Sequence, residues 1–341
     1  MNGRHKQKNM GKNSQDQFRK MTETPISGLI LSLAAPTIAS MMVTNLYNTA
    51  DTWFVSRAGT SASGAVSVVF SLMAIYQAFG FMFGHGAGSN ISRKLGEKRE
   101  DLVKTYASTS LFLSLACGAA VSVLGLLFMN PLLRLLGSTE TILPYARQYV
   151  FWVLLAGPLL SGSCVLNNIL RYEGQAFYAM IGLMTGGILN MIGDPILMFG
   201  CKLGVSGAGI STAVSQLISF GILLGMFRGD KTISTFHPGY FARDTRVVKE
   251  IVSAGSPSLI RQGLGSFTSI LLNHQAALYG DAAIAAMGIV GKVSFFISAV
   301  AIGIGQGFQP VSAFNFGARK YRRVAKAFRF TVISGTLLLG I

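Results

Sequence analysis

The chain has 341 residues, of which 50% are hydrophobic and only 12% are charged, and its formal net charge is +16. This composition is typical of helical membrane proteins and excludes an ordinary soluble globular domain. In a soluble protein the basic excess would suggest nucleic-acid binding. Here it lies in the connections between apolar runs, where topology and lipid headgroups explain it, so we expect no nucleic-acid partner.

The N-terminal segment, residues 1–24, is polar and contains six Lys or Arg residues. It lacks the apolar core and the small-residue cleavage site of a signal peptide. We therefore expect a mobile cytoplasmic tail.

Apolar runs long enough to cross a bilayer follow the tail. They lie near residues 27–50, 63–90, 105–129, 146–169, 177–200, 205–227, 250–278 and 283–312. A ninth run begins near residue 327 and has about 15 residues before the last position, below the roughly 20 that a span requires. The runs predict a six-helix bundle at 25–227, a polar cytoplasmic linker at 228–249 and an incomplete second bundle at 250–341.

Basic residues alternate between the two sides of this arrangement. Of the 29 Lys and Arg residues, 23 fall in the tail and in every second connection. By the positive-inside rule these connections face the cytoplasm. We expect a multi-pass protein of the inner (plasma) membrane with a cytoplasmic N-terminus and the lipid bilayer as its main partner.

The chain repeats itself after 221 residues without a gap. The shift aligns Pro36 with Pro257, Gly59 with Gly280, Gly84 with Gly305, Gly86 with Gly307 and Gly96 with Gly317. Six helices is an even number, so both halves enter the membrane from the same side and are related by an axis along the membrane normal. Residue 341 corresponds to Ala120, so we expect a fragment with about 9 of 12 helices, which would not transport as it stands.

Two acidic residues lie inside predicted helices, Asp51 and Asp194. An ionised residue in the membrane costs roughly 2.5–3.5 kcal/mol, so it needs a partner or a task. Asn190 is four residues before Asp194 and shares its helix face. Their oxygens predict a site for a proton or a small hard cation. The alternatives are a hydrated Asp51 at the interface, and an Asp194 that bonds a backbone group freed by Pro195.

An ordered set of short motifs runs through both halves. They are Ala35-Pro36-Thr37, Leu46-Tyr47-Asn48, Ile91-Ser92-Arg93-Lys94-Leu95-Gly96, Ile169-Leu170-Arg171-Tyr172-Glu173-Gly174, Gly207-Ala208-Gly209, Gly305-Gln306-Gly307-Phe308-Gln309-Pro310 and Phe314-Asn315-Phe316-Gly317-Ala318. With Asp51, Asn190 and Asp194-Pro195, they make residues 25–341 resemble the bacterial branch of the multidrug and toxic compound extrusion (MATE) family.

The resemblance implies an all-α antiporter of two six-helix bundles that exports amphipathic, often cationic drugs against Na⁺ or H⁺. It places the ion ligands on Asp51, Asn190, Asp194 and Thr212, although Thr212 alone is equally well explained as a hydroxyl bonding its own helix. Some family members carry a coupling glutamate on the seventh helix. This chain has no acidic residue between Glu250 and Asp281, which favours coupling through the first half.

Five further polar residues in the predicted helices are candidates for lining a substrate cavity. They are Asn167, Asn168, Arg261, Asn273 and His274. Each also has a structural explanation. The asparagines can bond between helices, Arg261 can snorkel or pair, and His274 can be a hydrogen-bonded packing residue.

We therefore expect a monomeric transporter, not an enzyme, with no cofactor besides the coupling ion and with a small amphipathic substrate. One alternative is a lipid-linked oligosaccharide flippase of the same superfamily, which a wide basic cavity would favour. Another is an intramembrane aspartyl protease using the two aspartates. The Gly-x-Gly-Asp signature of such proteases is broken here, because Met191 precedes Ile192-Gly193-Asp194.

Overall fold

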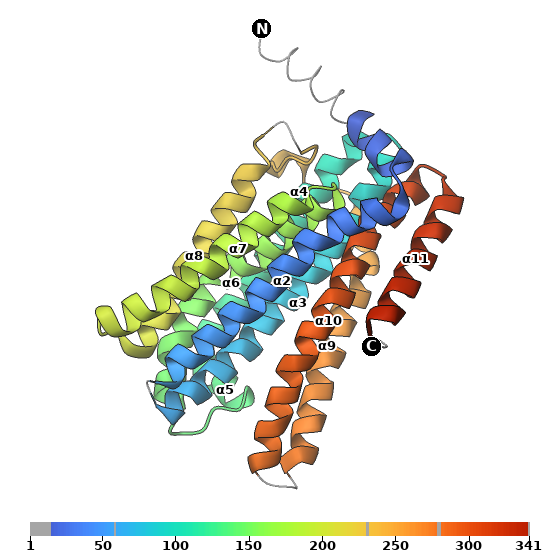
Figure 1. Ribbon diagram of the computed structural model, residues 1–341. Coiled ribbons are helices and arrows are strands. Elements are labelled where there is room, and N and C mark those ends of the chain that lie inside the picture. The colour runs from blue at the N-terminus through green and yellow to red at the C-terminus, as the bar shows by residue number, and fades with distance from the viewer. Residues whose placement is uncertain (1–14, 58, 230–231, 278–280, 340–341) are drawn as a thin grey trace.

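The computed structural model describes residues 15–57, 59–229, 232–277 and 281–339, apart from some side chains within α3, α9 and α10. Every regular element in these ranges is a helix (Figure 1). The elements are α2 (Ile26–Ser56), α3 (Thr60–Gly96), α4 (Glu100–Leu127), α5 (Met129–Leu135), α6 (Leu143–Tyr172), α7 (Ala176–Pro195), η1 (Ile196–Gly200), α8 (Gly204–Met226), η2 (Pro238–Tyr240), α9 (Thr245–Ala277), α10 (Asp281–Gly317) and α11 (Tyr321–Leu339).

Six stretches are long and apolar enough to cross a membrane among the residues described. They are Ile26–Val55, Gly64–Gly96, Glu100–Leu127, Leu143–Tyr172, Ala176–Gly200 and Gly204–Met226. Helices are the expected form, because a backbone in lipid must satisfy its own hydrogen bonds. The helices α9 and α10, with 33 and 37 residues, reach comparable lengths. The all-helical class predicted from the sequence is confirmed.

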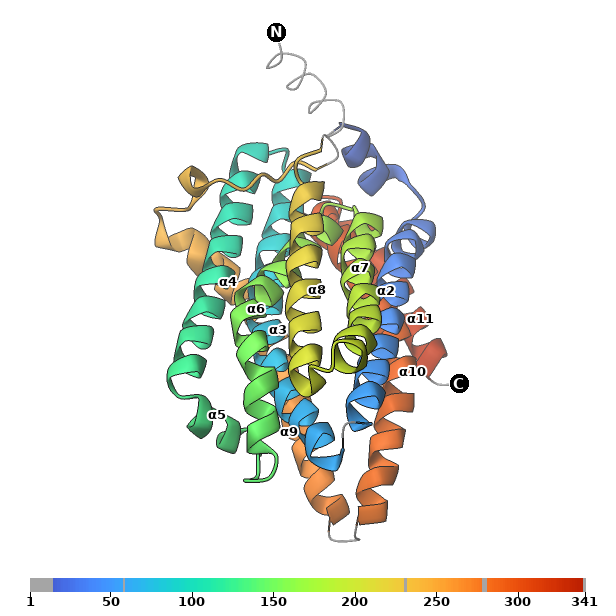
Figure 2. The same cartoon turned by 90° about the vertical axis from the view of Figure 1, so that its left-hand side faces the viewer.

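The first six long helices form one bundle with α3 and α6 at its centre. Figure 2 shows α8 between α4 and α7, in front of α3. The close approach of α3 and α6 depends on glycines: a Cβ on Gly80 would lie 2.6 Å from the Cβ of Cys164, and Gly157 packs directly on the Tyr76 ring. Small residues of this kind let helix backbones approach each other in membranes.

Contacts between the two halves repeat with the same 221-residue shift as the sequence. On α3, Gly86 packs against the carbonyl oxygen of Ile251 on α9. On α10, a Cβ on Gly307 would lie 2.7 Å from the carbonyl oxygen of Ile30 on α2. Both residues of the second contact are displaced by 221 positions from those of the first. The α3–α9 and α2–α10 interfaces are therefore images of each other.

The helices α3 and α10, which correspond to each other in the repeat, are also in direct contact. Gly96 packs against the carbonyl oxygen of Phe314, and Gly317 packs against that of Arg93. These two contacts exchange under the same shift of 221 residues, because 93 corresponds to 314 and 96 to 317. The α3–α10 interface between the halves is therefore self-complementary: each half contributes the same two positions of the repeat.

This interface lies at the end of the molecule that carries the N-terminal helix 15–23 and the segments 97–99, 173–175, 232–244 and 318–320 (Figure 1, top). We call it the basic end, because the sequence predicts that most Lys and Arg residues gather there. Nearby, the Ser92 hydroxyl donates to the carbonyl oxygen of Pro310 at 3.0 Å. The two halves are therefore in direct contact at this end.

The predicted mobile tail is wrong for its last ten residues, while residues 1–14 lie outside the described ranges. Residues 15–23 are helical, and Met21 is fully buried. The Asn315 amide donates to the carbonyl oxygen of Met21 at 3.0 Å, and Arg323 donates to that of Thr24 at 2.7 Å. The apolar Phe18 and Met21, within a polar segment, anchor this helix on the second half.

Candidate functional site

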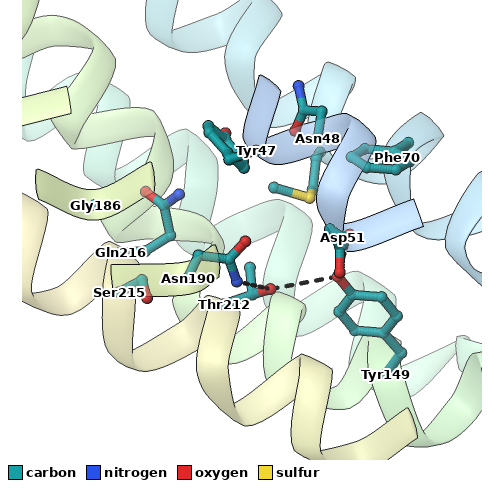
Figure 3. Close-up of a pocket in the computed structure, with 11 residues that line it drawn as sticks. Tyr47, Asn48, Asp51, Phe70, Tyr149, Gly186, Asn190, Thr212, Ser215 and Gln216 are labelled. Carbon is teal, nitrogen blue, oxygen red and sulfur yellow. Dashed lines mark hydrogen bonds between the residues drawn. The ribbon is translucent and has the colours of Figure 1, made fainter. Parts of the chain in front are cut away.

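Of the two membrane aspartates, which are far apart in sequence, Asp51 lines a small pocket (Figure 3), and Asp194 is hydrogen-bonded to Asn190, another residue that lines it. Asp51 comes from α2, Asn190 and Asp194 from α7, Thr212 from α8 and Tyr149 from α6. All five are buried. The four residues that the sequence and the family resemblance indicate are thus brought together, and Tyr149 joins them.

Asp51 is held by a hydroxyl from α6. The Tyr149 hydroxyl lies 3.3 Å from the Asp51 Oδ2 atom, to which it donates, and 3.3 Å from the Thr212 hydroxyl (Figure 3). Asp51 is only 3% exposed, so the alternative of a hydrated carboxylate at the interface does not describe it.

Asp194 is held from its own helix, one turn away. The Asn190 side-chain amide donates to Asp194 Oδ1 at 3.0 Å and also lies 3.2 Å from the Thr212 hydroxyl. A π-helical turn, η1, follows directly after Pro195. The proline removes one backbone donor, and the wider turn continues the helix past it. The Asp194 partner seen here is the Asn190 amide and not the backbone.

The pocket leaves negative charge uncompensated. The Oδ1 atom of Asp51 and the Oδ2 atom of Asp194 are buried without a hydrogen-bond donor. The two carboxyl groups belong to one network, because Tyr149, Thr212 and Asn190 link Asp51 to Asp194. No Lys, Arg or His is among the described residues that line the pocket. Two adjacent buried carboxylates without a counter-charge are unfavourable, so the site is suited to taking up a proton or a metal cation.

The size and donor set of the pocket fit one small ion. Its volume is about 20 Å³, close to what a single water-sized species occupies. The Asp51 carboxylate and the Thr212 hydroxyl line it and are oxygen donors of the type that hard cations prefer, and the Asp194 carboxylate lies next to the pocket residue Asn190. Asn190 turns its NH₂ group inward, and a half-turn of the amide would bring its oxygen to the same place. A volume of this size does not admit a peptide, which argues against the aspartyl protease alternative.

Tyr149 is the site residue that sequence reasoning missed. It lies in an apolar helix, where a tyrosine reads as an ordinary packing residue. Its only sequence signal is the polar hydroxyl in a span, a signal shared with Tyr47, which also lines the pocket. The contact with Asp51 bridges 98 positions of the chain and is visible only in the folded structure.

A larger cavity of about 240 Å³ adjoins this pocket and lies between the two halves. Tyr47, Gly186 and Gln216 line both spaces. Of the five predicted cavity residues, Asn167 and Arg261 line it.

The other three predicted cavity residues have different outcomes. Asn168 is not among the residues that line the cavity, and its amide donates to the carbonyl oxygen of Cys164 at 2.7 Å within α6. The side chains of Asn273 and His274 lie outside the described part of the chain. Asn167, although it lines the cavity, also bonds the carbonyl oxygen of Ala179 on α7 at 2.8 Å, the interhelical role that was its alternative.

Solved structures of transporters share this fold. An outward-facing conformation of a multidrug resistance MATE family transporter of the MOP superfamily matches with a TM-score of 0.85 at 24% identity, over 94% of this chain and 71% of that one. A MATE structure in complex with MaL6 matches with a TM-score of 0.88 at 25% identity, over 94% and 72%. A MOP superfamily transporter from Pyrococcus furiosus, described by the reverse polarity of its binding pocket, matches with a TM-score of 0.86 at 23% identity. The match covers 94% of this chain and 71% of that one.

Sequence comparison gives the same result. The multidrug export protein MepA of Staphylococcus haemolyticus (strain JCSC1435) is 27% identical over 96% of this chain and 72% of its own length. MepA of Staphylococcus aureus (strain MSSA476) is 28% identical over 90% of this chain and 68% of its own length. The MatE family model matches residues 36–196 and 257–341. Since the matched segments cover well over half of the sequence and lie in both halves of the fold, the chain belongs to the MatE family of membrane transporters.

Proposed function

We propose that the protein is a cation-coupled antiporter that exports amphipathic, often cationic drugs or metabolites, with Na⁺ or H⁺ as the coupling ion. One observation carries the proposal: two buried carboxylates without a described basic partner lie beside a cavity between the halves. The MepA relatives, named multidrug export proteins, support the same class of substrate. The protein acts as a monomer in the inner membrane with its N-terminus in the cytoplasm.

The shared wall between pocket and cavity supplies a route for coupling. Tyr47 on α2 and Gly186 on α7 face both spaces. An ion that neutralises Asp51 and Asp194 relieves their repulsion and lets α2 pack closer to α7, with Pro36 as the point where α2 flexes. Transport follows if ion and substrate prefer different states of the molecule, because tight binding to both states equally would shift nothing.

The test is dye efflux from proteoliposomes that contain the full-length protein, driven by an imposed Na⁺ gradient and then by an imposed pH gradient. We expect one gradient to drive efflux of a cationic dye, and Asp51→Asn and Asp194→Asn each to lower that rate at least tenfold. Asp101→Asn, which removes an exposed carboxylate at the start of α4, is the matched control and should keep the wild-type rate. Wild-type coupling in both pocket variants would refute the ion-site assignment.

A second candidate function is a lipid-linked oligosaccharide flippase. The observation that favours it is the presence of Arg171 and Arg261 in the cavity, since guanidinium groups bind phosphates well. The same liposomes separate the two functions. Dye that moves under neither gradient, together with transbilayer movement of a fluorescent polyprenyl pyrophosphate sugar, would establish the flippase instead.

A further inference from the structure

Arg171 is a buried cation that no described side chain neutralises. It lies in the last turn of α6 and is 6% exposed. Its Nε and Nη2 atoms are buried and have no hydrogen-bond partner. Within the described residues, no carboxylate lies within ion-pair distance of its guanidinium group. An unpaired charge buried in this way is costly, so its presence indicates a counter-charge that arrives from outside the chain.

The guanidinium group lies on the wall of the 240 Å³ cavity. Arg261, from α9 of the second half, lines the same cavity. These two arginines are the only charged residues among the described residues that line it. One positive group therefore comes from each half of the molecule, and the cavity itself offers no acidic partner to either.

The remaining walls are amphipathic. Apolar side chains from both halves line the space, namely Met41, Phe81, Leu160, Leu183 and Ile302. These side chains can contact the apolar part of a ligand without requiring a particular arrangement of polar groups in it, which suits molecules of varied structure. On the side of Tyr47 and Gly186, the cavity adjoins the pocket that Asp51 lines. The space thus has a positive region and a neighbouring negative one.

We propose that this cavity binds amphipathic substrates through a carboxylate, which pairs with Arg171 and is shared with Arg261. The planar guanidinium fork matches a carboxylate with two parallel hydrogen bonds, so Arg171 sets the specificity. That the bound molecule is a transport substrate rests on the proposed export function. The binding itself can be measured without transport. It adds acidic and zwitterionic molecules to the substrates and makes the charge of the substrate a determinant of affinity.

The test compares rhodamine B with its ethyl ester, two dyes that differ only in a free carboxylate. Binding to the full chain in phosphatidylcholine nanodiscs is measured by fluorescence anisotropy. We expect rhodamine B to bind at least tenfold more tightly than the ester. Arg171→Gln should weaken rhodamine B at least tenfold and leave the ester within twofold, and Arg171→Lys should restore part of the loss. Arg134→Gln is the matched control, because Arg134 is exposed and outside the cavity.

Three outcomes overturn the proposal: equal or weaker binding of rhodamine B by the wild type, no binding of either dye, or an Arg171→Gln variant that weakens both dyes equally. If Arg171→Gln does not fold, the proposal is tested by the preference of the wild type for rhodamine B and by the affinity of Arg261→Gln for it, which should also fall. The nanodiscs are then prepared with phosphatidylglycerol, and loss of the rhodamine B preference there would assign the arginines to a lipid headgroup. A binding preference without gradient-driven efflux would leave this site standing and reject the export function.

Discussion

At the scale of single residues, Glu173 is a buried acidic residue outside the membrane-spanning helices that binds the backbone of the linker. It follows α6 directly and is 2% exposed, and its carboxylate accepts the backbone N–H groups of Ile233 at 3.0 Å and Ser234 at 2.8 Å. Burial raises the pKa of this carboxyl group, and the hydrogen bonds from the linker oppose the rise. The residue therefore holds the linker between the halves against the basic end.

The raised pKa of Glu173 predicts a pH-dependent stability. A group whose pKa is higher in the folded state contributes stability that is present at low pH and lost as the pH rises through the folded pKa. The melting temperature of the wild type minus that of Glu173→Gln should therefore fall as the pH rises from about 4 toward 8, starting near the ordinary glutamate pKa of about 4.3. Thermal unfolding in detergent measures the difference. Glu140→Gln, at an exposed position, controls for the loss of one charge. A difference that rises with pH would contradict the prediction.

The candidate site could be predicted in part from single residues, for a physical reason. Asp51 and Asp194 are conspicuous because a carboxylate in a predicted span is costly, and helix periodicity adds Asn190. Thr212 came only from the family resemblance, since a threonine in a helix satisfies itself. The hydroxyl of Tyr149 in a span was too weak a signal to single it out, because tyrosines commonly pack in apolar helices. The unpaired state of Arg171 also depends on the fold, which shows that no described carboxylate reaches it.

At the scale of helices, hydropathy located the elements but not their ends. The run near 63–90 is a helix from Thr60 to Gly96, and the run near 283–312 is a helix from Asp281 to Gly317. Both helices continue past their apolar part, because α3 and α10 pack against each other at the basic end and need no lipid there. Tertiary contact, not hydropathy, therefore fixes where they stop. The repeat of 221 residues was the better guide, since it marks the glycines at which these helices touch.

Those glycines make a prediction about the fit of α10 on α2. A Cβ on Gly307 would lie 2.7 Å from the carbonyl oxygen of Ile30 and 2.9 Å from the backbone nitrogen of Ala34, whereas a Cβ on Gly305 meets nothing within 4 Å. Gly307→Ala should therefore lower the free energy of unfolding by about 1–3 kcal/mol through overpacking. Gly305→Ala should be neutral or raise it by up to about 1 kcal/mol, because alanine favours a helix.

Thermal unfolding of the two glycine variants, purified in the same detergent, gives this comparison. The variants change the same type of residue, in the same helix, two positions apart. Equal melting temperatures would mean that α2 and α10 are not packed as closely as the structure places them.

At the scale of the whole molecule, the fold is two bundles that meet through one self-complementary interface. Single contacts in it occur in pairs related by the repeat, as Gly96 with Phe314 and Gly317 with Arg93 show. The proposed alternating access would require this contact at the basic end, which lies beside the cavity between the halves, to separate in a second state. The bundle architecture followed from counting helices, but the contact of the halves at this end did not, because it depends on tertiary packing.

A disulfide between α3 and α9, where the halves also touch, tests whether the halves separate during transport. The His85 Nδ1 atom on α3 and the Ser258 Oγ atom on α9 are 2.7 Å apart, so these two side chains are in direct contact across the halves and are the pair to replace by cysteines. In a full-length protein whose native cysteines are replaced, oxidation of His85→Cys/Ser258→Cys should lower gradient-driven dye efflux at least tenfold, and reduction should restore it. The matched control is Ser114→Cys/Ser161→Cys, since these hydroxyls lie 2.6 Å apart on α4 and α6 of the same bundle. That disulfide should leave efflux unchanged. Efflux at the wild-type rate with the α3–α9 bond formed would mean that the halves do not separate at this interface.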